Sequence, residues 1–498
     1  MLPLFVLLSA CLPKDGFSEP DAPMLTAAPV AGPVVQPEPE PVVQPEPEPV
    51  VVAEPVDLGP LAVEVPDEGM EKRRATRRLT VYRSPTTSSK ARAILNPDAT
   101  FAVIERVDGP GCSREGWASV PGDGYVCLDH TEPSTEPLYL LPELVEFVHP
   151  APTDWETYST EGTYNTEPSG RPVRGLVPFV YAKVWRTWRG PVYASADAYA
   201  RGDRAVSRMG SGKKFRFVEA IETEKGTVLE RPNGSVIPSD EIFLYPISYF
   251  HGRELDSDPI PAGMLPAWVF GYEGGSVRAE PSMSADVVTV LDYHEPLWVR
   301  DAPVDKAGHW WEIPDALGAG VPGYVNDQVD IRHWVPREAP SEVLPGELWV
   351  DVDLGQQVLA LMEGDSPTFV TLVSTGDVGW STPQGIYRIY DKMIDTTMAS
   401  RVGPEEEDYY FVEGVPWTMH FRPRYALHGV FWHWGFGHRA SHGCVNLAPR
   451  DAQYVFDRVG PTMQAGWHTG FETPSDPGTV MRIRSGDSPV NDRRASLR

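Results

Sequence analysis

The sequence predicts a mainly β protein, with a C-terminal β-rich domain carrying one packed helix, preceded by small β-modules and a Pro/Glu-rich segment. Three observations support this prediction. Short apolar runs that alternate with polar residues and end in Gly or Pro recur through residues 78–334. A single amphipathic helical stripe lies near the C-terminus, and residues 12–71 are dominated by Pro, Glu, Val and Ala. The 498-residue chain is long enough for several domains.

The first eleven residues, MLPLFVLLSAC, are apolar from Leu2 to Leu8 and end in small residues before Cys11. They resemble a bacterial lipoprotein signal peptide, although the usual basic start is missing. An ordinary secretory signal and a chance apolar start remain alternatives. The resemblance implies that Cys11 is lipidated and that residues 1–11 are removed. No other segment has the roughly 20 apolar residues of a membrane span, so we expect an exported, periplasmic or cell-envelope protein that touches the membrane only through a lipid anchor.

Residues 12–71 form the next segment, in which VVQPEPEP at 34–41 is repeated at 42–49. Proline has no amide hydrogen, and the glutamates between the prolines repel one another, so this composition favours an extended polyproline II chain without a core. We interpret the segment as a disordered tether. A disordered tail without any mechanical role is the alternative.

An internal repeat organises the middle of the chain. LTVYRSPTTSSKARAILNPDATFAVIERV is echoed by GSVRAEPSMSADVVTVLDYHEPLWVRDA, and each copy continues to a Trp-centred strand and a closing Gly-Tyr-Val. Short strands punctuated by Gly and Pro at this spacing predict small barrels. The pattern resembles bacterial SH3-like domains at 78–131 and 266–334, with a weaker third copy at 180–250.

Cys112 and Cys127 both fall inside the first module. In an exported protein, two cysteines within one small module most simply form a disulfide, and two separate thiols are the alternative.

The charge balance of 70 acidic against 43 basic residues argues against nucleic acid and against an anionic membrane surface as partners.

The last domain is expected at 346–485, and residues 486–498 are expected to be a disordered tail. LWVDVD, QVLALME and TFVTLVSTG alternate as strands, and STPQGIYRIYDK, WTMHF, YALHGVF and GTVMRIRS add further strands. APRDAQYVFDRVG predicts a helix with Pro449 in its first turn and Gly460 at its C-cap. Its apolar stripe consists of Ala452, Val455, Phe456 and Val459.

Cys444, in RASHGCVN, is the cysteine without a structural or anchoring explanation, and an unpaired thiol in an oxidising compartment is a candidate nucleophile. His428 and His442 could each serve as its base, and a thiolate paired with imidazolium should react below the pKa of a free thiol. Gly443 permits close backbone approach to a reacting carbonyl. A metal site is the alternative, because histidines crowd this segment: His420, His428, His433, His438 and His442.

Several motifs together resemble the catalytic domain of L,D-transpeptidases over residues 346–485. They are VDVDLGQQVLALMEG, VSTGDVGWSTPQGIYRI, HG at 428–429 and SHGCVN at 441–446. The resemblance implies that Cys444 is the nucleophile, His428 the base, and the Gly429 carbonyl the group that orients His428. Gly443 and Cys444 N–H groups would form the oxyanion hole, and Ser441 and His442 would shape the nucleophile loop.

Substrate contacts are expected at Asn446, Trp417, Met419 and Tyr425. Many family members carry Arg at the position of Asn446. Because Asn cannot form the bidentate, charged contact of a guanidinium, recognition of a carboxylate at this position is in doubt.

The reaction that this resemblance implies is acyl transfer on peptidoglycan stem peptides through a thioester, without a cofactor or metal. The acceptor could be a second stem peptide, a lysine of a lipoprotein, or water, and the sequence does not choose among them. Two other classes remain open: an L,D-carboxypeptidase or amidase on the same fold, and a non-catalytic wall-binding protein.

Overall fold

The structure is a computed structural model. The residues that it describes are 70–136, 138, 179–184, 190–210, 213–245, 247–316, 318, 320–400 and 410–486. The signal segment with Cys11, nearly all of the 12–71 segment and all of the 486–498 tail except Gly486 lie outside the described residues. In the described part of the chain, no helix is both long and apolar enough to cross a membrane.

The first module includes a strand at Glu71–Ala75, which lies before the expected start at residue 78. This strand pairs with two later strands of the module. Its strands are β1 (Glu71–Ala75), β2 (Leu79–Tyr82), β3 (Ala91–Leu95), β4 (Thr100–Val103), β5 (Glu105–Val107), β6 (Trp117–Val120), β7 (Gly124–Cys127) and β8 (Thr131–Pro133), with a 3-10 turn at Leu128–His130. β1 pairs with β4 and β8, and the other strands follow the order β3-β2-β7-β6-β5. Their apolar faces share one core.

The other two modules repeat this strand order. The middle module contains β9 (Val180–Val184), β10 (Gly190–Val192), α1 (Ala196–Arg201), β11 (Ser207–Met209), β12 (Lys214–Phe217), β13 (Glu219–Thr223), β14 (Gly226–Glu230), β15 (Val236–Pro238) and β16 (Ile242–Leu244). β9 lies between β12 and β16, as β1 lies between β4 and β8. The order β11-β10-β15-β14-β13 corresponds to β3-β2-β7-β6-β5, with a single Tyr193–Val236 bridge joining β10 to β15.

The third module follows a short strand, β17 (Arg253–Glu254), that pairs with the C-terminal domain. It contains β18 (Met264–Val269), β19 (Gly275–Arg278), β20 (Val287–Leu291), β21 (Pro296–Arg300), β22 (Trp310–Ile313), β23 (Gly323–Asn326) and β24 (Ile331–His333). Its sheets run β21-β18-β24 and β20-β19-β23-β22. The expectation of barrels needs correction, because the described strands of each module form open sheets and no closed hydrogen-bonded ring.

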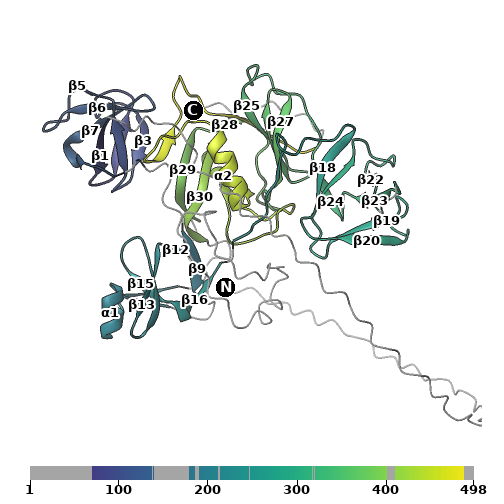
Figure 1. Cartoon of the computed structure of the whole chain (residues 1–498), viewed down its shortest axis with the longest axis horizontal. Helices are drawn as coiled ribbons and strands as arrows, with labels where there is room; N and C mark the ends of the chain where they lie inside the picture. The colour runs from purple at the N-terminus through teal and green to yellow at the C-terminus, as the bar shows by residue number, and fades with distance from the viewer. Residues whose placement is uncertain are drawn as a thin grey trace, which may run out of the picture. The chain divides into compact units, whose positions relative to one another are not determined.

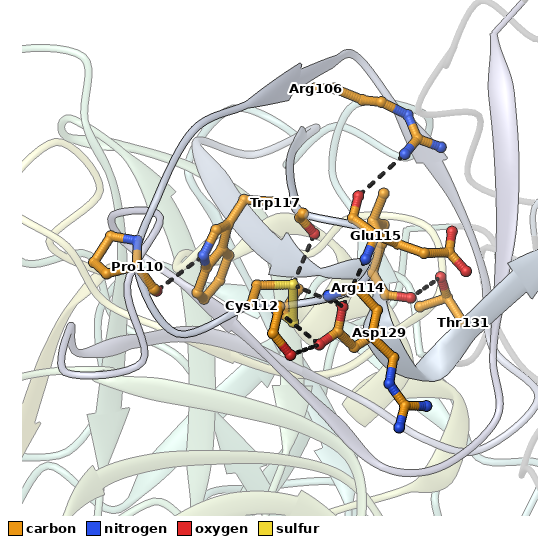
Figure 2. Close-up of a disulfide and its surroundings, with 12 residues drawn as sticks. Arg106, Pro110, Cys112, Arg114, Glu115, Trp117, Asp129 and Thr131 are labelled. Atoms are coloured by element: carbon orange, nitrogen blue, oxygen red, sulfur yellow. Dashed lines mark hydrogen bonds between the residues drawn. A yellow bond between two sulfur atoms is a disulfide. The ribbon is translucent and has the colours of Figure 1, made fainter.

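A disulfide between Cys112 and Cys127 ties a loop of the first module to strand β7, with the Cα atoms 5.6 Å apart. Figure 2 shows Asp129 beside this bond, facing the same loop. The Asp129 carboxylate accepts backbone N–H groups from Glu115, Ser113 and Arg114, which lowers its pKa to about 2. The Trp117 indole N–H donates to the Pro110 carbonyl at 3.0 Å, so side-chain contacts fix the loop at both ends.

The C-terminal domain consists of two sheets and one helix. Its elements are β25 (Leu348–Asp353), β26 (Val358–Glu363), β27 (Ser366–Leu372), β28 (Gly385–Arg388), β29 (Asp391–Ala399), β30 (Phe411–Arg422), β31 (Tyr425–Gly429), β32 (Val445–Leu447), α2 (Pro449–Arg458), β33 (Trp467–Phe471) and β34 (Val480–Arg484). One sheet has the order β17-β27-β26-β25-β34-β28, and the other contains β33-β29-β30 with β31 and β32 beside β30. A core of buried side chains joins both sheets to α2. The helix lies against β30 (Figure 1).

Helix α2 forms where the sequence pattern predicts it, with Pro449 in the first turn. The four stripe residues Ala452, Val455, Phe456 and Val459 are all buried. The C-cap differs from the prediction: it is Val459, in an extended conformation, and Gly460 lies beyond it.

Candidate active site

Two neighbouring strands carry the candidate catalytic residues. β31 and β32 pair in parallel, with Leu427 opposite Val445 and His428 opposite Asn446. Side chains alternate between the faces of a sheet, so His428 and Asn446 point to the same face. Cys444 directly precedes β32 and lies outside the strand. The strand pairing therefore brings the segments that carry His428 and Cys444 next to each other, although a long loop separates them in sequence.

The VSTG segment holds the loop that carries Cys444. Ser374 and Asn446 exchange two backbone hydrogen bonds, at 2.9 and 2.8 Å. The Thr375 carbonyl accepts N–H groups from Ala440 and Ser441. The Gln357 amide fixes Thr375 in turn, through one bond to its N–H and one to its hydroxyl. The buried polar network of Gln357, Ser374 and Thr375 therefore positions the loop that carries Cys444.

Ser441 closes the loop from within. Its hydroxyl donates to the Cys444 carbonyl at 2.6 Å and accepts the Gly443 N–H at 3.0 Å. Gly443 has φ of 111°, a conformation that glycine adopts without strain. In this structure the Gly443 N–H is thus engaged by Ser441, whereas the resemblance assigns it to an oxyanion hole.

His428 is buried and held in one orientation. Its Nδ1–H donates to the Gly429 carbonyl at 3.1 Å, and the residue is only 3% exposed. With the hydrogen on Nδ1, Nε2 of the neutral ring is the acceptor. Burial, together with the nearby His420, lowers the pKa of His428 to about 4, although the hydrogen bond to Gly429 opposes the shift. The ring is therefore neutral at physiological pH and can accept a proton at Nε2.

The Cys444 thiol is partly exposed, and its Sγ–H points to the Arg424 carbonyl at 3.9 Å. Burial raises the pKa of this thiol to about 11, although a backbone hydrogen bond near Ala426 opposes the shift. These two pKa shifts oppose the expected thiolate–imidazolium pair. The directions of both pKa shifts favour a neutral thiol beside a neutral imidazole.

Aromatic side chains lie beside the loop that carries Cys444. The exposed His442 ring lies between Trp380, at 4.8 Å, and Tyr410, at 5.3 Å, measured between ring centroids. Burial raises the pKa of Tyr410, and the charge of Cys444 raises it further while Arg424 lowers it. Trp380, Tyr410 and Arg424 were not predicted as site residues, and only Trp380 falls within a motif that the sequence singled out.

The expected substrate contacts fall into different places. Trp417 and Met419 are both 0% exposed and belong to the hydrophobic core, so they offer no surface to a substrate. Asn446 is 2% exposed, and its amide N–H donates to Nε2 of His433 at 2.9 Å. Tyr425 is half-buried beneath Gly443, where a Cβ would lie 2.6 Å from its ring.

The crowded histidines have separate partners rather than a common centre. His420 bonds to Asp391, His433 to Asn446 and His438 to the Phe270 carbonyl. Over the described residues, the close grouping of potential ligand atoms is Cys112, Cys127 and Asp129, and its two sulfurs are bonded to each other.

Comparison with known proteins identifies the C-terminal domain. Residues 347–483 match the YkuD family, described as an L,D-transpeptidase catalytic domain. This match confirms the resemblance inferred from the motifs, whereas the SH3-like and lipoprotein assignments gain no support from it. YciB of Bacillus subtilis (strain 168), to which L,D-transpeptidase activity is provisionally assigned, is 23% identical over 131 residues. The match covers 22% of this chain and 61% of YciB, about three fifths of that relative's length.

Solved structures of L,D-transpeptidases match part of this chain. A mutant of the Enterococcus faecium enzyme is 19% identical, with a TM-score of 0.22, and the match covers 28% of this chain and 49% of that one. The Mycobacterium smegmatis enzyme is 16% identical, with a TM-score of 0.24, and the match covers 38% of this chain and 90% of that one.

Proposed function

We propose that this protein is a cysteine-dependent L,D-transpeptidase acting on peptidoglycan stem peptides. One observation carries the proposal. Within the segment that matches the catalytic domain family, the Gly429 carbonyl orients His428 on β31, and Cys444 directly precedes β32, the strand that pairs with β31. This is the arrangement of a nucleophile, a base and a group that orients the base.

In the proposed acylation step, Cys444 Sγ attacks the carbonyl of the third stem residue while His428 Nε2 takes the thiol proton. The negative charge on the carbonyl oxygen is received by the Cys444 N–H and, after release from Ser441, by the Gly443 N–H. The carbon–nitrogen bond to the fourth residue then breaks. D-alanine leaves with the proton from His428, and a thioester remains on Cys444.

In the second step an amine attacks the thioester, and His428 takes a proton from that amine. The carbon–sulfur bond breaks, and the Cys444 thiolate recovers the proton. A side-chain amine of a second stem gives a crosslink, a lysine of a lipoprotein gives an anchored protein, and water gives a trimmed tripeptide. This substrate requires export, with Cys11 as the proposed lipid anchor of an envelope protein.

The reaction can be tested by incubating the protein with disaccharide-tetrapeptides and identifying the products by mass spectrometry. We expect crosslinked dimers with loss of one D-alanine from wild type and none from Cys444→Ala. Tripeptides alone would assign the protein to the hydrolases, and no product would favour a wall-binding role. By resemblance to the family, a carbapenem should add one intact drug mass to the peptide containing Cys444, and this adduct should be absent in Cys444→Ala.

A further inference from the structure

Strand β12 of the middle module turns two basic side chains toward the C-terminal domain. Phe215 and Phe217, which are 4% and 1% exposed, belong to the core of the middle module. Alternation along the strand places Lys214 and Arg216 on the opposite face. Arg216 forms an ion pair with Asp395 of β29. Lys214 itself pairs with Val412 of β30 in a parallel register.

Lys214 lies close to the ring cluster around the candidate base. Its Nζ is 5.7 Å from the centroid of the Trp432 ring, and the Trp432 ring is 5.9 Å from the ring of His428. The charge of Lys214 also contributes to the lowered pKa of His433, the partner of Asn446. The ammonium group therefore lies near the rings that pack beside His428, although Lys214 is outside the segment 347–483 that matches the family.

This ammonium group has no anionic partner in the described part of the chain. Burial, together with the charge of the neighbouring Lys183, lowers the pKa of Lys214 to about 8. A partly buried cation without a counter-charge is unfavourable, because it has lost water without gaining an ion pair. The contact with the Trp432 face offsets only part of this cost. A bound anion would supply the missing charge.

We propose that Lys214 binds a carboxylate of the stem peptide and so contributes substrate recognition from outside the catalytic domain. The inference rests on the proposed function. Stem peptides carry carboxylates near the reacting carbonyl, on the third residue and on the γ-linked D-glutamate that precedes it. Asn446 cannot supply a positive charge, and its amide is already bound to His433. The middle module supplies the cation through Lys214.

The test compares Lys214→Met with Lys213→Met and Lys214→Arg. Lys213 is the adjacent lysine, and its Nζ lies 5.1 Å from the Phe411 ring instead of the Trp432 ring. Each protein is assayed with the natural tetrapeptide and with two analogues, one amidated at the third residue and one at D-glutamate. We expect Lys214→Met to lose about tenfold or more in kcat/KM for the natural peptide, as removal of a charge-assisted contact implies.

Amidation of the relevant carboxylate should cost wild type the same factor and cost Lys214→Met nothing further. The analogue that behaves in this way identifies the carboxylate. Lys214→Arg should retain the preference for the charged peptide, and Lys213→Met should behave as wild type. Equal losses on charged and amidated peptides, or equal effects of the two Met variants, would overturn the inference.

A binding measurement separates failure of this inference from failure of the proposed function. Calorimetry with Cys444→Ala and Cys444→Ala/Lys214→Met, using the same three peptides, requires no turnover. Loss of the preference for the charged peptide in the double variant supports the carboxylate site even if no acyl transfer occurs. The same affinity for the charged peptide in both variants rejects the site even if wild type forms crosslinks.

Discussion

At the scale of single residues, the resting chemistry of Cys444 and His428 differs from the usual expectation for a reactive cysteine. The fold buries His428 and partly buries Cys444, and burial disfavours the charged form of each. The pKa of Cys444 is therefore raised to about 11 and that of His428 lowered to about 4. The geometry favours a mechanism in which the proton moves to His428 as the sulfur attacks, rather than one that starts from a stored thiolate.

This leads to a prediction for alkylation of Cys444 by iodoacetamide. At pH 7 the rate at the Cys444 peptide should be at least about tenfold below that of a free cysteine, because only the thiolate reacts and its pKa is raised. The rate should keep rising above pH 8.5, the region where a free thiol titrates. Rates are measured by mass spectrometry over a pH series.

His428→Gln is the matching control for this experiment. It should leave the slow alkylation unchanged and abolish acyl transfer, because only the latter needs a base. His442→Ala should retain measurable acyl transfer, since that exposed ring only borders the loop. A titration midpoint below pH 8 in wild type that disappears in His428→Gln would instead establish a resting ion pair.

Gly443 gives a second prediction at the residue scale. Gly443→Ala combines an unfavourable φ of 111° with a Cβ placed 2.6 Å from the Tyr425 ring. The loop must shift, and a displacement of about 1 Å at a reacting atom can cost about a hundredfold in rate. Gly364→Ala, with φ of 58° and its nearest atom 3.9 Å away, should lose only about 1 kcal/mol of stability and keep its rate. Similar kcat/KM values for both variants would contradict the prediction.

At the scale of secondary structure, the periodicity of the sequence predicted helix α2 and its buried face, but it did not predict which residues form the candidate site. The stripe of α2 follows a 3.6-residue period, so its burial could be predicted. The parallel β31–β32 pair joins distant segments, and no local pattern in the sequence predicted it; only the motif resemblance assigned His428 and Cys444 to one site. Trp417 was expected to contact substrate but lies in the core, because an aromatic residue on a strand suits either place.

Asp451, in the first turn of α2, ties three elements together and gives a prediction at this scale. The carboxylate is fully buried and accepts His251 Nδ1–H at 2.6 Å, the Gly252 N–H at 3.1 Å and the Thr371 hydroxyl. Burial lowers the pKa of His251, but the hydrogen bond and charge of Asp451 outweigh it, so the pKa is raised. Asp451→Asn should lower the free energy of unfolding by about 3 kcal/mol, because it leaves buried partners unsatisfied.

Asp457→Asn provides a control on the same helix, measured by denaturant unfolding at pH 7.5. Burial raises the pKa of Asp457 to about 7, so its charge is not favoured by the fold. Loss of this charge in Asp457→Asn should lower the free energy of unfolding by no more than about 1 kcal/mol. If Asp451→Asn and Asp457→Asn lowered the free energy of unfolding equally, any polar change in α2 would be destabilising. The hydrogen bonds of Asp451 would then not explain the loss.

At the scale of the whole molecule, the loop between His428 and Cys444 is held by residues from two accessory modules. Tyr181 of the middle module stacks on Phe431 with ring centroids 3.7 Å apart. From the third module, Tyr293 donates to the Trp434 carbonyl at 2.9 Å, and Arg332 donates to the Gly437 carbonyl at 3.1 Å. The repeat predicted that these modules exist, but no local pattern in the sequence encodes contacts between segments so far apart.

Acidification should destabilise this assembly, because the fold holds several histidines in their neutral form. Burial lowers the pKa of His294, His333 and His428 to about 4 and that of His433 to about 3. An unfolded histidine titrates near pH 6.5, so between about pH 6.5 and 4 the unfolded chain binds more protons than the folded one. The free energy of unfolding should fall by about 1.4 kcal/mol per pH unit for each extra proton.

Four described groups act in the opposite direction, since the pKa values of His251, Asp327, Asp330 and Asp457 are raised and the folded chain binds protons there first. They are fewer than the histidines whose pKa is lowered by burial, because His438 adds a fifth to the four named above. The net effect therefore remains a loss of stability with falling pH. Thermal unfolding at pH 7.5, 6 and 5 should show Tm falling by several degrees over this range, on the order expected for a few kcal/mol. His333→Phe removes one of the neutral histidines and should flatten the decline, while His130→Gln, at an exposed position, should not. A Tm that stays level or rises toward pH 5 would show that carboxylates, rather than buried histidines, dominate the proton balance of this fold.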